Sequence, residues 1–209
     1  MKDQQVVPNS WREAEPTDEH LLVAYRKLGD REAFARLVHR YERELYSYLR
    51  RYLGDAEMAE DAFQATFLQI HLKCDQFEEG RAFRPWMYTI ATNQAIDAQR
   101  RNRRHRMVSL DRSSGHENDL GTLIDLLVSG DDDPVVSVGQ AERRQLVQEM
   151  LEQLPEYLRV VIQLVYYQGL KYREAADVLD VPVGTVKSRV HTAILKLTEI
   201  WKQAHADRE

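Results

Sequence analysis

Arginines, aromatic residues and an asparagine occur together between residues 81 and 106, in a pattern typical of contact with nucleic acid. This stretch holds seven arginines and one acidic residue, Asp97, which gives it a net charge of +6. Arginine side chains neutralise phosphates, and aromatic rings stack on unpaired bases. Five of the arginines fall within residues 100–106, more than a helix end needs to satisfy its last carbonyls and its dipole. The stretch therefore predicts a site that holds a nucleic-acid strand.

The aromatic residues of this stretch have two explanations. Phe83, Trp86 and Tyr88 lie close to Phe77 in the sequence, and rings so placed ordinarily pack against one another in a core. They could instead form stacking surfaces beside the arginines, as single-stranded nucleic acid requires. The sequence leaves both explanations open.

A second group of side chains with chemical potential lies upstream. Glu57, Glu60, Asp61 and His71 fall on one predicted helix. Carboxylates at three-to-four spacing usually form a solvated face or a partner surface, and the chain has no second ligand cluster. The single cysteine, Cys74, excludes an internal disulfide and a cysteine-based zinc site. We therefore expect a protein that is not an enzyme, with no catalytic residue, no metal and no cofactor.

The charge pattern also predicts the domain organisation. The 209 residues carry a net charge of −5, and residues 111–133 alone hold seven acidic residues and one arginine. A charged segment with glycine and serine cannot bury enough surface to fold. We expect a mobile acidic arm at 1–16, domains at 17–106 and 134–204, and a flexible acidic linker at 107–133. No apolar run approaches the roughly 20 residues of a membrane span, and no export signal is present, so we expect a cytoplasmic protein.

Hydrophobic periodicity predicts an all-α fold with two small helical domains. Only 9 glycines and 6 prolines interrupt the chain, which favours long helices. Thr17, Asp30 and Asp55 are N-cap candidates for the first three helices, and a glycine ends the first two. Pro85 suits the first turn of a fourth helix, which ends in the arginine run.

The second domain has the pattern of a four-helix domain with a helix-turn-helix. Pro134 and Pro155 each start an amphipathic helix, and the second of these is predicted to run to Gly169. A helix, the short connection VPVG and another helix follow, with Ala175 and Ala176 permitting a close crossing. Helix pairs without a DNA function are common in bundles. The polar residues where a major-groove reader would keep its contacts are Thr185, Lys187, Ser188, Arg189 and His191.

About residues 18–106 and 134–200 resemble the extracytoplasmic-function sigma factors, the two-domain initiation subunits of bacterial RNA polymerase. In the first domain the resemblance is carried by YLRRYLGDAEMAEDAFQATFLQIH and RPWMYTIATNQAIDAQRRNRR. In the second it is carried by LPEYLRVVIQLVYYQGLKYREAADVLDVPVGTVKSRVHTAILKL. Two ordered blocks on either side of a variable linker argue against a chance similarity.

For the first domain, the resemblance implies a sigma region 2 domain that docks on polymerase and opens the promoter. The segment AEDAFQATF is similar to the one that docks on the polymerase clamp helices, and its candidate residues are Glu60, Asp61, Gln64 and Phe67. Asn93 would line a pocket for an unpaired promoter base near minus ten, and Asp97, an asparagine in some relatives, would select the base through an exocyclic amine. The residues assigned to the displaced strand are Arg100, Arg101, Arg103 and Arg104, with Phe83 and Trp86 if these two rings stack.

For the second domain, the resemblance implies a sigma region 4 domain whose recognition helix reads the minus-thirty-five duplex with the five polar residues named above. Many relatives carry arginines at the positions of Thr192 and Ile194, so no DNA contact is assigned to these two residues. The implied partners are core RNA polymerase, through its clamp helices and flap, double-stranded and single-stranded promoter DNA, and an anti-sigma factor. The acidic linker would lie in the RNA path of the polymerase.

An alternative function remains open at this point. The chain could be a stand-alone helix-turn-helix regulator that binds an operator without polymerase. Such a regulator should footprint duplex DNA alone, usually as a dimer on a palindrome, whereas a sigma factor should hardly bind DNA alone.

Overall fold

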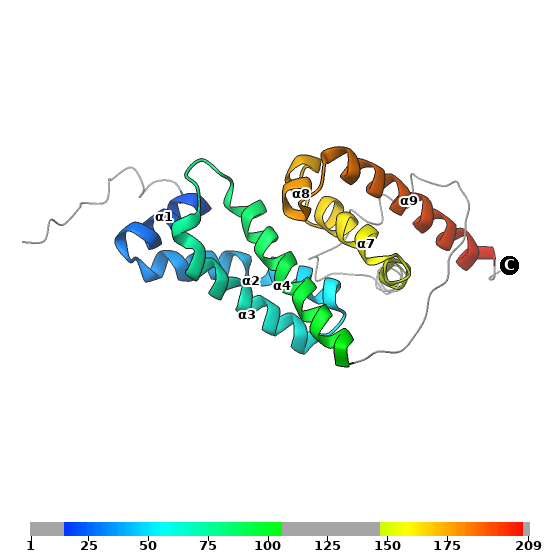
Figure 1. The fold of residues 1–209 in the computed structure, drawn as a ribbon, viewed down its shortest axis with the longest axis horizontal. Helices are drawn as coiled ribbons and strands as arrows, with labels where there is room; N and C mark the ends of the chain where they lie inside the picture. Colours follow the sequence, from blue (N-terminus) through cyan, green and yellow to red (C-terminus); the bar gives the residue numbers. More distant parts are fainter. Residues whose placement is uncertain (1–14, 106–146, 207–209) are drawn as a thin grey trace, which may run out of the picture. The chain divides into compact units, whose positions relative to one another are not determined.

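The computed structural model describes residues 15–105 and 147–206. These residues form helices and connecting turns without a strand, which confirms the predicted all-α class. The chain divides into two compact units, Met1–Arg100 and Arg101–Glu209 (Figure 1). Most of the predicted arm and all of the predicted linker lie outside the described residues. Among the described helices, none is long and apolar enough to cross a membrane.

The described residues of the first unit form four α-helices and a short 3-10 turn, and the last of these helices continues past Arg100 to His105. The N-caps of the first three helices are those that the sequence predicts. The Thr17 side chain accepts a hydrogen bond from the His20 N–H, that of Asp30 from the Glu32 and Ala33 N–H groups, and that of Asp55 from the Met58 N–H. Caps of this kind satisfy N–H groups that a helix leaves without partners. The elements are α1 (Asp18–Leu28), α2 (Arg31–Leu53), α3 (Ala56–Lys73), η2 (Cys74–Gln76) and α4 (Phe83–His105).

Helix α2 is the element against which the other three α-helices of this unit pack (Figure 1). Its side chains form ring contacts or hydrogen bonds with α1, α3 and α4. Contacts with α4 advance in the same direction along both helices, from Glu44 with Arg84 to Tyr48 with Thr92, so these two helices run parallel. Leu45 and Leu49 of α2 are fully buried. The buried apolar stripe of α2 is thus the core of the unit.

The second unit contains a helical stretch at 147–152 followed by α7 (Glu156–Ile162), η3 (Gln163–Tyr167), α8 (Tyr172–Leu179) and α9 (Val183–Ala206). The sequence predicts one helix from Pro155 to Gly169, but α7 ends at Ile162 and continues as a π-helical turn. The Gln168 N–H donates to the Gln163 carbonyl at 3.0 Å, and Gly169 follows with φ of 62°. The wider turn changes which side chains face the core, which hydrophobic periodicity does not reveal.

Helices α8 and α9 form the predicted helix-turn-helix. Ala175 of α8 is fully buried, as are Val186 and Ala193 of α9, and the small side chains let the helices approach closely. Asp180 adopts φ of 50° between them, and the Val181 N–H donates to the Ala176 carbonyl at 3.1 Å. Aspartate tolerates this left-handed conformation better than most residues. The turn therefore places the first residues of α9 at the surface.

Candidate functional site

Helix α4 separates its apolar and polar residues onto two faces. Ala91, Ala95 and Ala98 are buried. The exposed residues at three-to-four spacing on the other side are Asn93, Asp97, Arg100 and Arg101. Arg103 and Arg104 continue the same helix, but their side chains lie outside the described part. The structure thus brings four of the predicted strand-binding residues onto one exposed face.

The charges on this face are available to a ligand because they interact only weakly with each other. The Asp97 Oδ1 and Arg100 Nη1 atoms are 3.7 Å apart, and both side chains are more than half exposed. Such surface pairs are worth about 0 to 1 kcal/mol, so an incoming phosphate can displace the contact. The Asn93 side chain has no hydrogen-bond partner within the described residues, which leaves its amide free to bind.

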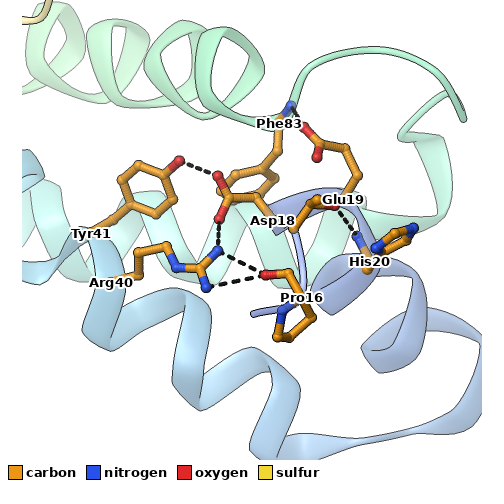
Figure 2. A network of polar contacts seen from close by, with 8 residues as sticks. Pro16, Asp18, Glu19, His20, Arg40, Tyr41 and Phe83 are labelled. Carbon is orange, nitrogen blue, oxygen red and sulfur yellow. Dashed lines mark hydrogen bonds and ion pairs between the residues drawn. The ribbon is translucent and has the colours of Figure 1, made fainter. Parts of the chain in front are cut away.

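The N-terminus of α4 is fixed by α1. A Glu19 carboxylate oxygen accepts a hydrogen bond from the Phe83 N–H at 2.8 Å, and Figure 2 shows this contact beside a second network. In this second network, the Asp18 carboxylate accepts a hydrogen bond from the Arg40 guanidinium at 2.5 Å and another from the Tyr41 hydroxyl. Partial burial raises the pKa of Glu19, but hydrogen bonds, first that from Phe83, outweigh it and hold the pKa below its ordinary value. Glu19 therefore caps α4 as an anion.

The loop before α4 is held by α1 as well. The Arg26 guanidinium donates to the Phe77 carbonyl at 2.8 Å and to a Glu79 carboxylate oxygen at 2.9 Å. The Lys27 Nζ atom lies 2.6 Å from the same Glu79 oxygen. One helix thus anchors both ends of the segment that leads into α4.

The first turns of α4 are tied to α2 by polar contacts, two of them partly buried and one fully buried. One Glu44 carboxylate oxygen accepts from the Arg84 Nη2 at 2.6 Å and from the Tyr88 hydroxyl at 2.6 Å. One turn further, the Tyr48 and Thr92 hydroxyl oxygens are 2.8 Å apart in the core. Thr92 points into the core, whereas the side chain of Asn93 is exposed. These contacts determine which residues α4 offers to a ligand.

The structure assigns the two predicted stacking rings to the core. Phe83 is fully buried and Trp86 is 9% exposed. Their ring centroids lie 6.1 Å apart, and that of Trp86 lies 5.1 Å from Phe77. Rings packed in this way cannot stack on a base, so the geometry favours the packing explanation.

Helix α3 exposes three of its four predicted docking residues. Glu60, Asp61 and Gln64 are exposed, and the Gln64 side chain donates to a Glu60 oxygen at 2.9 Å. Phe67 instead is buried, with its ring edge-on to Phe34 at a centroid distance of 6.1 Å. Its aromatic neighbours on α2 and α3 explain why it packs inward rather than facing a partner.

The same face of α3 continues into two exposed leucines that the sequence analysis missed. Leu68 is 56% exposed and Leu72 is 60% exposed. They lie one turn apart, following Gln64 at helical spacing. Both lie outside the apolar stripe of α3 that includes Phe67 and Ile70. This offset is the sequence feature that indicates that the two leucines are exposed. Acidic and apolar side chains together form a surface that a protein partner could bind.

The beginning of α9 presents the predicted recognition residues at the surface. Lys187, Ser188 and His191 are exposed, whereas Thr185 and Arg189 are half-buried. The Arg189 guanidinium lies over the Tyr157 ring of α7, 5.6 Å from its centroid. The described residues include no group of three or more side chains suited to a metal ion.

The two positions of α9 to which no DNA contact is assigned differ in exposure. Ile194 is buried, so this position cannot contact a phosphate. Thr192 is exposed, and its hydroxyl donates to the Ser188 carbonyl at 2.9 Å within the helix.

Comparison with known proteins identifies the family. The chain is 35% identical over 167 residues to the ECF RNA polymerase sigma factor SigW of Bacillus subtilis (strain 168), covering 79% of this chain and 87% of that protein. It is 34% identical over 183 residues to the ECF RNA polymerase sigma-E factor of Escherichia coli (strain K12), covering 86% and 92%. The chain belongs to the ECF RNA polymerase sigma factor family.

Family models match both units of this sigma factor. Residues 37–105 match sigma-70 region 2, which includes α3 and α4, and residues 144–197 match sigma-70 region 4, which includes α7, α8 and most of α9. The candidate faces on α3, α4 and α9 all lie within these matches. The protein is therefore an alternative sigma factor, which directs transcription with RNA polymerase, and not a stand-alone operator-binding regulator.

Solved structures share the fold. CnrH, in complex with the cytosolic domain of CnrY, superimposes with a TM-score of 0.63 at 24% identity over 90% of this chain and 99% of that chain. The sigma factor RpoE of Bartonella quintana, in complex with the anti-sigma factor NepR, gives a TM-score of 0.60 at 24% identity over 81% and 96%.

Proposed function

We propose that this sigma factor binds core RNA polymerase through α3, captures the opened minus-ten strand with α4 and reads the minus-thirty-five duplex with α9. The observation that carries the proposal is the exposed polar face of α4, where Asn93, Asp97, Arg100 and Arg101 lie opposite buried alanines. A helix with cationic and amide groups on one rigid face can follow the phosphates of one strand while it reads one base.

On α4, each residue has a separate role in strand capture. The Asn93 amide offers two donors and an acceptor to the edge of an unpaired base. Asp97, one turn on, accepts hydrogen bonds and repels phosphate, so it favours a base with an exocyclic amine at that point. The predicted phosphate contacts are Arg100, Arg101, Arg103 and Arg104. Base capture offsets the unstacking of that base, which costs a few kcal/mol.

On α9, the exposed residues face the major groove. Lys187, Ser188 and His191 have the accessibility that base or phosphate contact needs, and Thr185 and Arg189 flank them. Since Ile194 is buried, the phosphate contacts of this helix end earlier than in relatives with arginine there. We expect a correspondingly weaker upstream contact.

On α3, docking combines charge and apolar contact. Glu60, Asp61 and Gln64 supply the polar part that the resemblance assigns to the polymerase clamp helices, and Leu68 and Leu72 extend it with apolar area. Exposed leucines beside acids suit a partner surface with basic and apolar side chains. Phe67 supports this face from beneath. The second unit supplies the contact with the polymerase flap.

The protein acts by binding rather than by covalent chemistry. Sigma factors are initiation factors, and every candidate face described above is a binding surface. We place its action in the cytoplasm, where polymerase and promoter DNA are found. We further propose control by an anti-sigma factor, since RpoE of Bartonella quintana was solved with one.

The acidic segment at 107–133 lies outside the described residues, and its role in the RNA path of polymerase stays a prediction. Deleting residues 131–133 removes three of its seven acidic residues. We expect the ratio of abortive to full-length transcripts to change. Unchanged yields of both products would contradict this role.

Run-off transcription tests the proposed function. Purified core polymerase is mixed with pooled genomic fragments, with and without this protein, and transcript starts are mapped. Discrete starts that share two upstream elements are expected only with the protein. If it neither binds core polymerase nor produces such starts, the proposed function is wrong.

A further inference from the structure

Tyr157 lies outside the helix-turn-helix, yet its ring contacts a residue of the recognition helix. It is the second residue of α7 and is 51% exposed. The guanidinium carbon of Arg189 lies 5.6 Å from the ring centroid, within the range of a cation–π interaction. Helices α7 and α9 pack against each other, which fixes the distance between the two backbones. The contact therefore joins two helices that pack against each other in the second unit.

This contact restricts a side chain that is otherwise mobile. A free arginine samples many rotamers and loses that freedom when it binds a ligand. The ring covers one flat side of the guanidinium, whereas the N–H donors point outward in its plane and remain available. Arg189 is accordingly half-buried, while its neighbours Lys187 and Ser188 are exposed. Its guanidinium is oriented before any DNA arrives.

We propose that Tyr157 is a positioning residue for Arg189 in promoter recognition. It acts through Arg189 by holding the guanidinium in one orientation toward the upstream DNA element. The inference rests on the proposed function of α9. It adds a residue at the start of α7 to the helix-turn-helix residues that determine DNA affinity.

The size of the effect follows from the exposure of the pair. A cation–π contact at an exposed site corresponds to about a two- to fivefold change in an equilibrium constant. We expect the Tyr157→Leu substitution to weaken holoenzyme binding by that factor. The loss should fall on the same base pairs, or the same phosphates, that depend on Arg189.

The test is a double-mutant cycle with the full-length protein bound to core polymerase. The probe is a promoter found by run-off mapping with the wild type, together with copies substituted at each upstream base pair. The variants are Tyr157→Leu, Tyr157→Phe, Arg189→Ala and the Tyr157→Leu/Arg189→Ala double variant. Tyr157→Phe is the matched control, because it keeps the ring and removes only the hydroxyl. Thermal unfolding of each variant reports on the fold.

Positioning predicts three results together. Tyr157→Phe binds within about twofold of the wild type, Tyr157→Leu loses affinity, and the double variant binds no more weakly than Arg189→Ala. The inference is overturned if the two losses multiply, if Tyr157→Leu binds like the wild type, or if Tyr157→Phe loses as much as Tyr157→Leu. If the wild type itself gives no promoter, the proposed function fails and this inference fails with it.

Discussion

Single residues on α4 differ in whether their polar atoms are already bonded. Thr92 is buried and its hydroxyl contacts that of Tyr48, whereas Asn93 beside it is exposed. A change at Thr92 would disturb the core, but a change at Asn93 removes only groups that face outward. Asn93 is therefore the residue at which binding and folding can be separated.

We predict that the Asn93→Ala variant binds core polymerase normally but opens promoters poorly. Loss of a hydrogen-bonded base contact weakens recognition by about 1 to 3 kcal/mol. Reactivity of unpaired thymines in the promoter to permanganate measures opening, and a gel-shift with core polymerase measures docking. Gln148→Ala is the control, since it removes an exposed amide at another site. Normal strand opening by Asn93→Ala would show that Asn93 does not line the base pocket.

The arrangement of α1 and α4 depends on one carboxylate at a helix start. We predict that the Glu19→Gln variant is less stable than the wild type by up to about 1 kcal/mol, because a neutral cap interacts less with the α4 N-terminus and Glu19 is partly exposed. The pKa of Glu19 is lowered in the folded state. The stabilisation is therefore fully present above the unfolded pKa of about 4.3 and is lost as the pH falls through the folded pKa.

Urea unfolding of both proteins at a series of pH values measures this difference. The difference in the free energy of unfolding between the two proteins should be constant near neutral pH and should decrease below about pH 4. A difference that grows on acidification would mean that Glu19 does not cap α4 as an anion.

The face of α3 gives a second prediction at the level of the helix. We expect the Leu68→Ser and Leu72→Ser variants to bind core polymerase at least about fivefold more weakly, since each removes apolar area that an interface would bury. Their stability should change little, because both side chains are more than half exposed. Competition binding to core polymerase measures the effect. The matched control is Leu28→Ser, an exposed leucine on α1, and equal losses at all three positions would argue against an α3 docking face.

The features that the sequence predicts are local ones. Caps at Thr17, Asp30 and Asp55 depend on a few neighbouring residues, and the structure confirms them. The burial of Phe67 and Phe83 depends also on rings far away in the sequence, those of Phe34 and Tyr41, which local spacing does not supply. The π turn after α7 likewise depends on packing within the second unit. Residue type and spacing place the exposed polar faces of α4 and α9, but contacts decide which residues within a motif face outward.

For the whole molecule, the proposed function gives each of the two units its own DNA-reading face on one chain. Region 2 and region 4 would each bind its own promoter element while both are attached to the same polymerase. The distance and the rotation between the two elements on the DNA must then match the spacing that the polymerase imposes.

We predict that insertion of about five base pairs between the two promoter elements abolishes transcription directed by this protein. Half a helical turn of DNA places one element on the opposite side of the duplex, so α4 and α9 cannot both bind their elements. Run-off transcription on the altered promoter measures the loss. A promoter with a substituted spacer of unchanged length serves as the control and should remain active. Transcription that continues from the original start after the insertion would mean that one unit alone selects the promoter, and that α9 contributes affinity without defining the start.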